Sequence, residues 1–180
     1  MSSKKKIILG VTGSIAAFKS AELVSRLVQK GCDVSVVMTK EAKEFITPLT
    51  LAMLSGNKVY EGMFETPEAW DIEHVSLADS ANLVLIAPAT ACVIGKLACG
   101  ICDDLLTCTV VATKAPVVIA PAMNDGMYAN KVIADNIERL KKNGVKFIGP
   151  VKGRLACGRE GLGRMSDVED IVRLALGYLR

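Results

Sequence analysis

The sequence predicts a three-layer α/β fold in which a parallel sheet carries helices on both faces. Short, apolar and mostly β-branched segments recur along the chain, and segments with helical periodicity separate most of them. Gly31 and Gly144 stand where two of these helices are expected to end, each just before a strand. Because strands buried on both faces have continuous apolar sequences, this alternation is typical of flavodoxin-like and Rossmann-like sheets.

The elements are predicted in chain order from these patterns. The strands are expected at residues 7–11, 33–38, 83–87, 117–120 and 145–148. The helices are expected at residues 15–30, 90–100, 103–112, 125–143 and, as an amphipathic closing segment, 167–179. Residues 152–166 are rich in glycine and arginine and have little apolar periodicity, so they are interpreted as a surface loop that acts as a lid or flap. No repeat or linker is evident, and residues 1–180 are interpreted as a single domain.

Composition and charge narrow the classes of function. The formal charge is only +3, and the most basic run, residues 4–6, flanks the first strand, so nucleic-acid binding is not expected. No apolar run approaches the roughly 20 residues needed to cross a bilayer, and no signal peptide is evident. A cytoplasmic protein that does not bind membranes is therefore expected, and its six cysteines are interpreted as reduced thiols.

The first strand is followed by a glycine-serine turn. Gly13 and Ser14 precede an expected helix, where backbone N–H groups and a hydroxyl are placed to hold a phosphate. The turn lacks both the full dinucleotide fingerprint and the lysine of a P-loop, which argues against NAD and ATP. A turn used only for packing fits the same residues. Thr39, after the second strand, is expected both to cap the next helix and to contact the same ligand.

Histidine and cysteine supply the remaining candidate chemistry. The single histidine, His74, stands ahead of an expected short helix, and a lone histidine is more often structural than catalytic. Cys99 and Cys102 have C-x-x-C spacing, but no second ligand pair accompanies them, so they are interpreted as small core residues and no metal is expected. Cys157 differs because neighbouring arginines lower the pKa of a thiol and an exposed loop leaves it reactive.

Four blocks taken together resemble the family of homo-oligomeric flavin-containing cysteine decarboxylases. They are GSIAA at 13–17 with Lys19, His74 ahead of residues 77–78, the stretch from APATA at 87–91 through GICDDLL at 100–106, and PAMNDGMY at 121–128. GRLACG at 153–158, followed by GLGRM at 161–165, is similar to the substrate-covering flap of family members on the coenzyme A pathway. The resemblance covers residues 7 to about 170.

The resemblance implies FMN-dependent decarboxylation of 4'-phosphopantothenoylcysteine to 4'-phosphopantetheine, by thiol oxidation, loss of CO2 and reduction of the ene-thiol. It implies that His74 is the active-site base, that Asn124 binds the substrate carboxylate, and that Cys157 donates the proton of the reductive step. The residues that it implies around the FMN are Gly13, Ser14, Ile15, Thr39, Thr90, Ala91, Cys92, Val93 and Ala122. Those that it implies around the substrate are Asn124, Met127, Arg154 and Ala156.

The family also implies partners. Its members form homotrimers, some of which assemble into dodecamers, with His74 of one chain expected beside the flavin of another. In many bacteria the domain is fused to the synthetase that makes its substrate, 4'-phosphopantothenoylcysteine.

This sequence departs from the family pattern at three positions. Cys92 and Val93 replace the usual Asn and Thr, and Tyr128 replaces the usual Trp, so flavin affinity, rate or substrate choice is expected to differ. Two alternatives stay open: a peptidyl-cysteine decarboxylase, and a flavin-binding regulatory subunit without catalysis.

Overall fold

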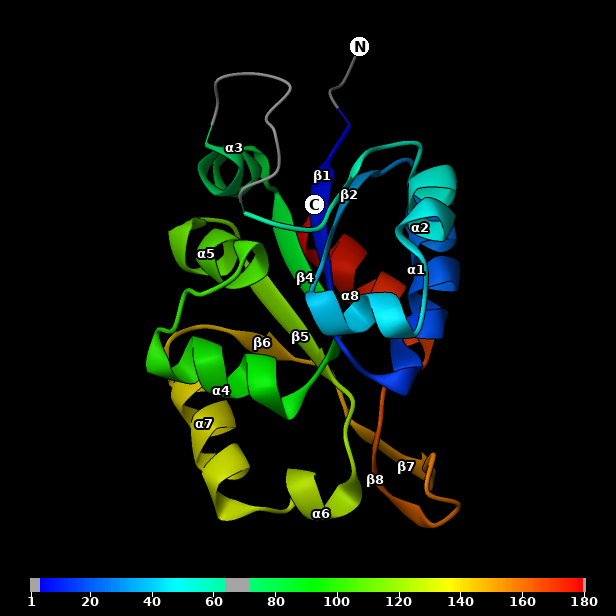
Figure 1. The fold of residues 1–180 in the computed structure, drawn as a ribbon, viewed down its shortest axis with the longest axis vertical. Coiled ribbons are helices and arrows are strands. Elements are labelled where there is room, and N and C mark those ends of the chain that lie inside the picture. Colours follow the sequence, from blue (N-terminus) through cyan, green and yellow to red (C-terminus); the bar gives the residue numbers. More distant parts are fainter. Residues whose placement is uncertain (1–3, 64–71, 180) are drawn as a thin grey trace.

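The computed structural model describes residues 4–63 and 72–179. Within them, the main sheet holds six parallel strands in the order β3-β2-β1-β4-β5-β6, and β7 pairs with β8 in a separate antiparallel hairpin (Figure 1). The strands are β1 (Lys6–Val11), β2 (Asp33–Met38), β3 (Val59–Tyr60), β4 (Leu83–Ala89), β5 (Val117–Pro121), β6 (Lys146–Phe147), β7 (Val151–Arg154) and β8 (Glu160–Arg164). No helix in this part of the chain is long and apolar enough to span a membrane.

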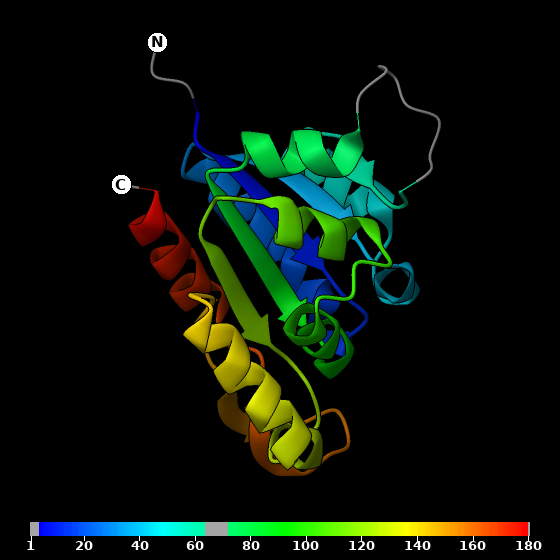
Figure 2. The ribbon, with the colours of Figure 1, turned by 90° about the vertical axis from the view of Figure 1, so that its left-hand side faces the viewer.

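Helices cover both faces of the main sheet. The 3-10 helices are η1 (Ile15–Phe18) and η2 (Lys40–Glu44). The α-helices are α1 (Lys19–Gln29), α2 (Pro48–Ser55), α3 (Glu73–Ser80), α4 (Ala91–Cys99), α5 (Leu105–Ala112), α6 (Asp125–Tyr128), α7 (Lys131–Lys142) and α8 (Val168–Tyr178). Helices α1, α2 and α8 lie on one face, and Figure 2 shows α3, α4, α5 and α7 on the other.

The core has two halves because side chains alternate along each strand. On β1, Ile7 and Leu9 are buried with α1, α2 and α8, whereas Ile8 is buried with the helices of the opposite face. All three side chains are fully shielded from solvent. The central strands are therefore buried on both faces, and the predicted three-layer α/β fold is confirmed.

Every strand expected from the sequence is present, with small shifts at the ends. The prediction missed η2, α2 and β3. The apolar side chains of α2 do not form a stripe along one side, so helical periodicity could not reveal it. Its start is marked instead by Thr47, whose hydroxyl accepts a hydrogen bond from the Thr50 N–H at 3.3 Å, followed by Pro48 in the first turn.

Two predictions in the second half of the chain were wrong. Residues 125–143 form two helices, α6 and α7, because the Asn130 side chain accepts from the Val132 N–H at 2.9 Å and starts a new helix. Residues 152–166 are not an irregular loop, since most of them belong to the β7–β8 hairpin. Glycine has low strand propensity and gives no alternating apolar pattern, so this hairpin was not apparent from the sequence.

Candidate active site

The loops after β1, β4 and β5 meet at the carboxyl ends of the strands, where parallel sheets bind ligands. The buried Thr12 hydroxyl donates to the Pro88 carbonyl at 2.8 Å and accepts from the Thr90 N–H at 3.0 Å. The Ala122 N–H donates to the Ala89 carbonyl at 2.9 Å. These hydrogen bonds join loops that are far apart in sequence and fix the floor of the site.

Side chains in three of these loops start helices. Ser14 accepts from the Ala16 N–H at 3.3 Å, Thr90 from the Val93 N–H at 3.3 Å, and Asn124 from the Gly126 N–H at 2.9 Å. Ser14, Thr90 and Asn124, which the sequence analysis assigned to ligand binding, are therefore also helix N-cap residues, and they fix the conformation of their loops. Asn124 accepts through Oδ1, which leaves its amide NH2 directed elsewhere.

A first cavity, of about 380 Å³, opens at these loops and is called here the strand-loop pocket. It is lined by Gly13, Ser14, Thr39, Glu41, Thr90, Ala91, Cys92, Val93, Lys96, Asp104, Ala122, Met123 and Met127. Eight of the nine residues implied to surround the flavin are in this set, and Ile15 is the exception. These eight residues come from four loops that are separate in sequence, and the fold brings them together around one pocket.

Thr39 makes the strand-loop pocket suitable for a polar ligand. Its hydroxyl is buried, makes no cap hydrogen bond to η2, and has no partner among the described residues. The expectation that Thr39 caps the next helix was therefore wrong. A buried hydroxyl without a partner costs free energy that a bound ligand recovers. A ligand with phosphate and hydroxyl groups, such as FMN, fits this pocket.

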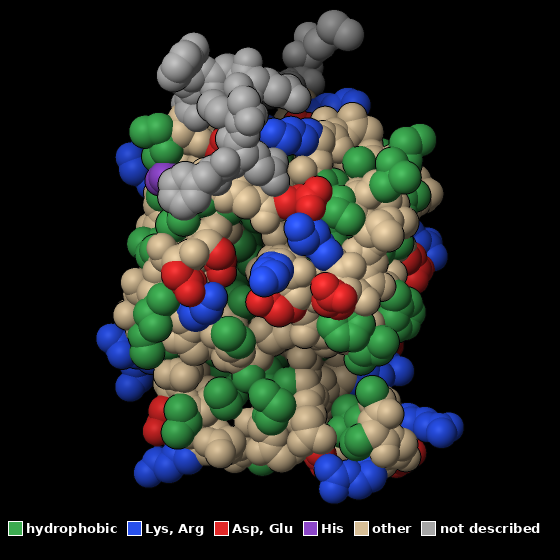
Figure 3. Space-filling view, viewed as in Figure 1, with side chains coloured by type: hydrophobic (Ala, Val, Ile, Leu, Met, Phe, Trp, Pro, Cys, Tyr) green, Lys and Arg blue, Asp and Glu red, His purple; other side chains and the backbone are tan. Residues whose placement is uncertain are grey.

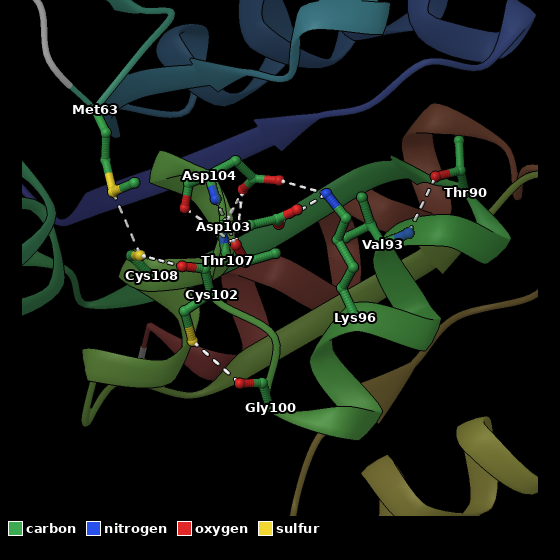
Figure 4. Close-up of polar contacts among 10 residues, drawn as sticks. All are labelled: Met63, Thr90, Val93, Lys96, Gly100, Cys102, Asp103, Asp104, Thr107 and Cys108. Atoms are coloured by element: carbon green, nitrogen blue, oxygen red, sulfur yellow. Dashed lines mark hydrogen bonds and ion pairs between the residues drawn. The ribbon is translucent and has the colours of Figure 1, made fainter.

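A charge cluster borders the same pocket. The Lys96 Nζ lies 2.8 Å from Asp103 Oδ1 and 3.3 Å from Asp104 Oδ2 (Figure 4). The hydrogen bond to Asp103 is the main cause that raises the pKa of Lys96, and the same contact lowers the pKa of Asp103. Asp104 also starts α5, where its Oδ1 accepts from the Thr107 N–H at 2.8 Å. The cluster ties α4 to α5 beside the pocket.

The cysteines near this cluster differ from the prediction. Cys99 and Cys102 are exposed, so their interpretation as core residues was wrong. The Cys102 thiol is 3.6 Å from the Gly100 carbonyl, and the Cys108 thiol is 3.3 Å from the Cys102 carbonyl (Figure 4). All six cysteines are free thiols. Within the described residues, no three His, Cys, Asp or Glu side chains form a group that could hold a metal ion.

A second cavity, of about 690 Å³, lies between the loops and the β7–β8 hairpin and is called here the hairpin pocket. It is lined by Ser14, Ile15, Ala16, Phe18, Lys19, Ala122, Met123, Asn124, Arg154, Leu155, Ala156, Cys157, Gly163, Arg164 and Met165. The two pockets share Ser14, Ala122 and Met123, so they adjoin. Its size is within the range of roughly 300–1,000 Å³ usual for small-molecule sites.

Glycines allow the hairpin to lie close to the loop after β5. The Met123 N–H donates to the Gly163 carbonyl at 3.0 Å, and a Cβ on Gly163 would lie 2.1 Å from the Met123 carbonyl oxygen. A Cβ on Gly161 would lie 2.7 Å from the Cβ of Asp125. Only glycine allows this approach without a shift of the backbone.

The approach of the hairpin brings Asn124 and Cys157 together. The Asn124 Nδ2 lies 4.0 Å from the Cys157 Sγ. The Cys157 thiol is exposed, and its pKa is lowered first by the backbone N–H of Arg159 and then by the guanidinium of the same residue. The predicted reactive cysteine therefore has the expected electrostatic environment. Arg159 is itself paired with Asp125 at 3.3 Å.

The remaining predicted site residues lie as follows. Arg154 and Ala156 line the hairpin pocket with Asn124 and Cys157, whereas Met127 lines the strand-loop pocket. His74 is the second residue of α3, not ahead of a helix as expected, and within the described part of the chain it lines neither pocket. The chain alone does not bring His74 to Asn124 and Cys157.

Sequence reasoning did not assign Glu41, Lys96, Asp104 or Arg164 to the site. Each reaches a pocket only through packing between separate elements. Lys96 is one turn beyond Cys92 on α4, and this spacing was the one available signal, because residues four apart share a helix face.

The sequence of this chain is similar to those of known proteins. The family model described as Flavoprotein matches residues 1–180. The coenzyme A biosynthesis bifunctional proteins CoaBC of Vibrio vulnificus and Bacillus subtilis are each 47% identical, over 170 and 175 residues that cover 94% and 97% of this chain. These stretches are 42% and 43% of the two relatives, so the chain spans less than half their length.

Solved structures share the fold over nearly the whole chain. A cysteine-to-serine mutant of PPC decarboxylase complexed with pantothenoylaminoethenethiol has a TM-score of 0.86 and 30% identity, covering 98% of this chain and 99% of that one. The FMN-dependent cysteine decarboxylase SpaF has a TM-score of 0.83 and 28% identity, with 98% of each chain covered.

Proposed function

This chain belongs to the Flavoprotein family, and from that premise we propose that it is an FMN-dependent carboxy-lyase acting on 4'-phosphopantothenoylcysteine. The observation that carries the proposal is the pairing of Asn124 and Cys157, 4.0 Å apart, in a pocket that adjoins the strand-loop pocket. The relatives named for coenzyme A biosynthesis and the PPC decarboxylase structure support the choice of substrate.

The cofactor site is the strand-loop pocket. The hydroxyl of Thr39, the turn at Gly13 and Ser14 and the first turn of α4 would hold FMN, and Ala122 would close one side. When bound, FMN would supply the electron sink needed for a reversible two-electron oxidation of the substrate at the carbon that bears the thiol. Cys92 places an exposed thiol in this pocket where the family usually has an amide, so it removes one hydrogen-bond donor and acceptor from the flavin site.

The chain's own residues bind the substrate and move protons. Asn124 donates its amide to the substrate carboxylate, with Met127, Arg154 and Ala156 contributing to the surrounding contacts. A C=S group formed at the thiol-bearing carbon is beta to the carboxylate, so loss of CO2 gives an ene-thiol. Cys157 then donates the proton that completes 4'-phosphopantetheine, and its exposed thiol is well placed to be reprotonated by water.

His74 is proposed to act as the base from a neighbouring subunit, in a homotrimer or in a dodecamer built from four trimers. His74 is half-buried on α3, which packs against α5. Val75 and Val111 on these helices are 39% and 56% exposed. Figure 3 shows hydrophobic side chains along the side of the molecule where α3 and α5 lie. Exposed apolar surface of this kind is typical of subunit contacts.

Residues 1–180 form one decarboxylase domain that works with a phosphopantothenoylcysteine synthetase, because the relatives it matches are bifunctional proteins more than twice its aligned length. The reaction is cytoplasmic, as expected for a step of coenzyme A biosynthesis.

Mass spectrometry of the product tests the proposal. Flavin-loaded protein incubated with 4'-phosphopantothenoylcysteine should release one CO2 per substrate and yield 4'-phosphopantetheine without added reductant. A peptide ending in cysteine serves as the competing substrate. Turnover of the peptide alone would make the protein a peptidyl-cysteine decarboxylase, and bound flavin with turnover of neither would indicate a regulatory subunit.

A further inference from the structure

Cationic side chains converge on the hairpin pocket from three elements. Lys19 begins α1, Arg154 ends β7 and Arg164 ends β8, and all three line the pocket. No Asp or Glu is among the described residues that line it. The side chains that line the pocket therefore carry a net positive charge. Binding of the substrate carboxylate by Asn124 does not account for three cations.

Arg164 is held in place with part of its hydrogen-bonding capacity unused. Its Nη2 lies 2.8 Å from Asp167 Oδ1, which orients the guanidinium. Its Nε is shielded from solvent and has no partner among the described residues. A shielded donor of this kind costs free energy unless an acceptor meets it, and a guanidinium can bind phosphate through two donors at once.

Lys19 adds a charge that no close carboxylate neutralises. Among the described residues, no carboxylate oxygen lies within ion-pair distance of either Lys19 or Arg154. Glu22 and Asp167 line a neighbouring groove that Lys19 also borders, so acidic groups are near but outside the pocket. Next to Lys19, the apolar Ile15 and Phe18 are 56% and 59% exposed and line the same wall.

We propose that Lys19 and Arg164, together with Arg154, bind the phosphate of the substrate, while Ile15 and Phe18 contact its branched apolar part. The proposal rests on the proposed function, because it assumes a ligand with a carboxylate at one end and a phosphate at the other. It makes Lys19 and Arg164 specificity-determining residues that favour a phosphorylated substrate over a peptide. The phosphate of FMN is the other source of the same chemistry.

Binding of a matched pair of ligands tests this assignment. Isothermal calorimetry on the flavin-loaded protein gives the Kd of 4'-phosphopantothenoylalanine, which has no thiol to oxidise and is not turned over, and of its dephosphorylated form, pantothenoylalanine, for the wild type, Lys19→Gln and Arg164→Gln. The wild type should prefer the phosphorylated ligand, and each variant should reduce that preference by about tenfold or more. Lys30→Gln removes a cation at the far end of α1, outside the hairpin pocket, and should leave the preference unchanged.

Flavin content and a charge-preserving variant distinguish the phosphate of the substrate from the phosphate of FMN. Bound flavin, measured by absorbance, should stay at the wild-type level in both variants, and Arg164→Lys should retain most of the preference. Loss of flavin in Lys19→Gln and Arg164→Gln would mean that these cations hold the phosphate of FMN, which would overturn the proposal. Equal weakening of both ligands, or no change in preference, would overturn it as well.

CO2 release, measured beside the Kd values, distinguishes failure of the phosphate site from failure of the proposed function. If the wild type binds the phosphorylated ligand more tightly but releases no CO2 from 4'-phosphopantothenoylcysteine, the decarboxylase assignment fails while the phosphate site stands. If CO2 is released equally well from 4'-phosphopantothenoylcysteine and from pantothenoylcysteine, and the two Kd values are equal, the phosphate site fails while the decarboxylase assignment stands.

Discussion

The strand-loop pocket and the hairpin pocket share three residues but are held by different contacts. Buried hydrogen bonds, such as those of Thr12 to Pro88 and Thr90, join the loops of the first. The second depends on the close approach of Gly163 to Met123, and its reactive Cys157 is exposed. The difference implies that cofactor retention and turnover are separable. Changes in the hairpin should stop the chemistry and leave flavin bound, whereas changes in the loops should weaken flavin binding.

Replacing Cys157 gives the largest expected separation. Cys157→Ser should reduce formation of 4'-phosphopantetheine by about 10²- to 10⁴-fold, because a general acid of the reductive step is lost. CO2 release should continue for one turnover, and the ene-thiol should accumulate with flavin still bound. Product mass spectrometry and flavin absorbance measure both effects.

Cys99→Ser is the matched control for this change. Cys99 is also an exposed thiol, but it lines neither of the two pockets in the described structure. The control should keep wild-type turnover. Wild-type turnover in Cys157→Ser would instead remove the proton-donor role from Cys157.

A single methyl group at Gly163 should disturb the hairpin without touching the reacting groups. In Gly163→Ala the new Cβ meets the Met123 carbonyl oxygen at 2.1 Å, so the hairpin must move away from Asn124. Misplacement on this scale is expected to lower kcat/KM by roughly 10- to 100-fold. Flavin content should not change, because the buried hydrogen bonds of the strand-loop pocket remain.

The control is Gly177→Ala on α8, where an added Cβ has no neighbour within 4 Å and alanine favours the helix. It should match or slightly exceed the wild type in thermal stability and keep its activity. Loss of flavin from Gly163→Ala would show that the two pockets are not separable.

Two isosteric threonine-to-valine changes test the strand-loop pocket, one through FMN binding and the other through the stability of the apoprotein. Thr39→Val removes a buried hydroxyl with no described partner, so it should weaken FMN binding roughly tenfold while the apoprotein stays as stable or becomes more so. Thr12→Val breaks two buried hydrogen bonds and should lower the free energy of unfolding of the apoprotein by about 1–3 kcal/mol. Flavin titration and denaturant unfolding of both apoproteins measure the contrast. Equal destabilisation by the two changes would mean that Thr39 has a structural partner.

The location of the strand-loop pocket was largely predictable from the sequence, because it follows from the geometry of a parallel sheet. Parallel strands place their carboxyl ends at one edge, so apolar runs followed by Gly13, Thr39 or Thr90 already located the loops that meet. The family resemblance then supplied roles that periodicity cannot give. The location of Lys96 was not predictable, because its ion pairs with Asp103 and Asp104 depend on how α4 packs beside α5.

The hairpin and the cysteines were harder to predict for separate reasons. Gly161 and Gly163 gave no strand pattern, although the glycines are what allow the hairpin to approach Asp125 and Met123. Cys99 was placed in the core because its side chain is apolar, yet it ends α4 at the surface. His74 cannot be brought to the site by any sequence rule applied to one chain, since the proposed partner is another subunit.

Replacing Arg159 is expected to have the smallest effect on the hairpin, a shift in the pKa of Cys157. Its backbone N–H and guanidinium lower the pKa of Cys157, so the protonated donor is lost at a lower pH than for an ordinary thiol. Arg159→Gln keeps the backbone contact and removes the guanidinium, so the pKa of Cys157 should rise. The alkaline limb of the reductive step should then move to higher pH, and alkylation of Cys157 at neutral pH should slow because less thiolate is present. Lys152→Gln, which removes another exposed cation of the hairpin, should leave both curves in place. An alkaline limb that stays fixed while alkylation slows would assign the limb to a group other than Cys157, and the proton donor would have to be sought on the neighbouring subunit with His74.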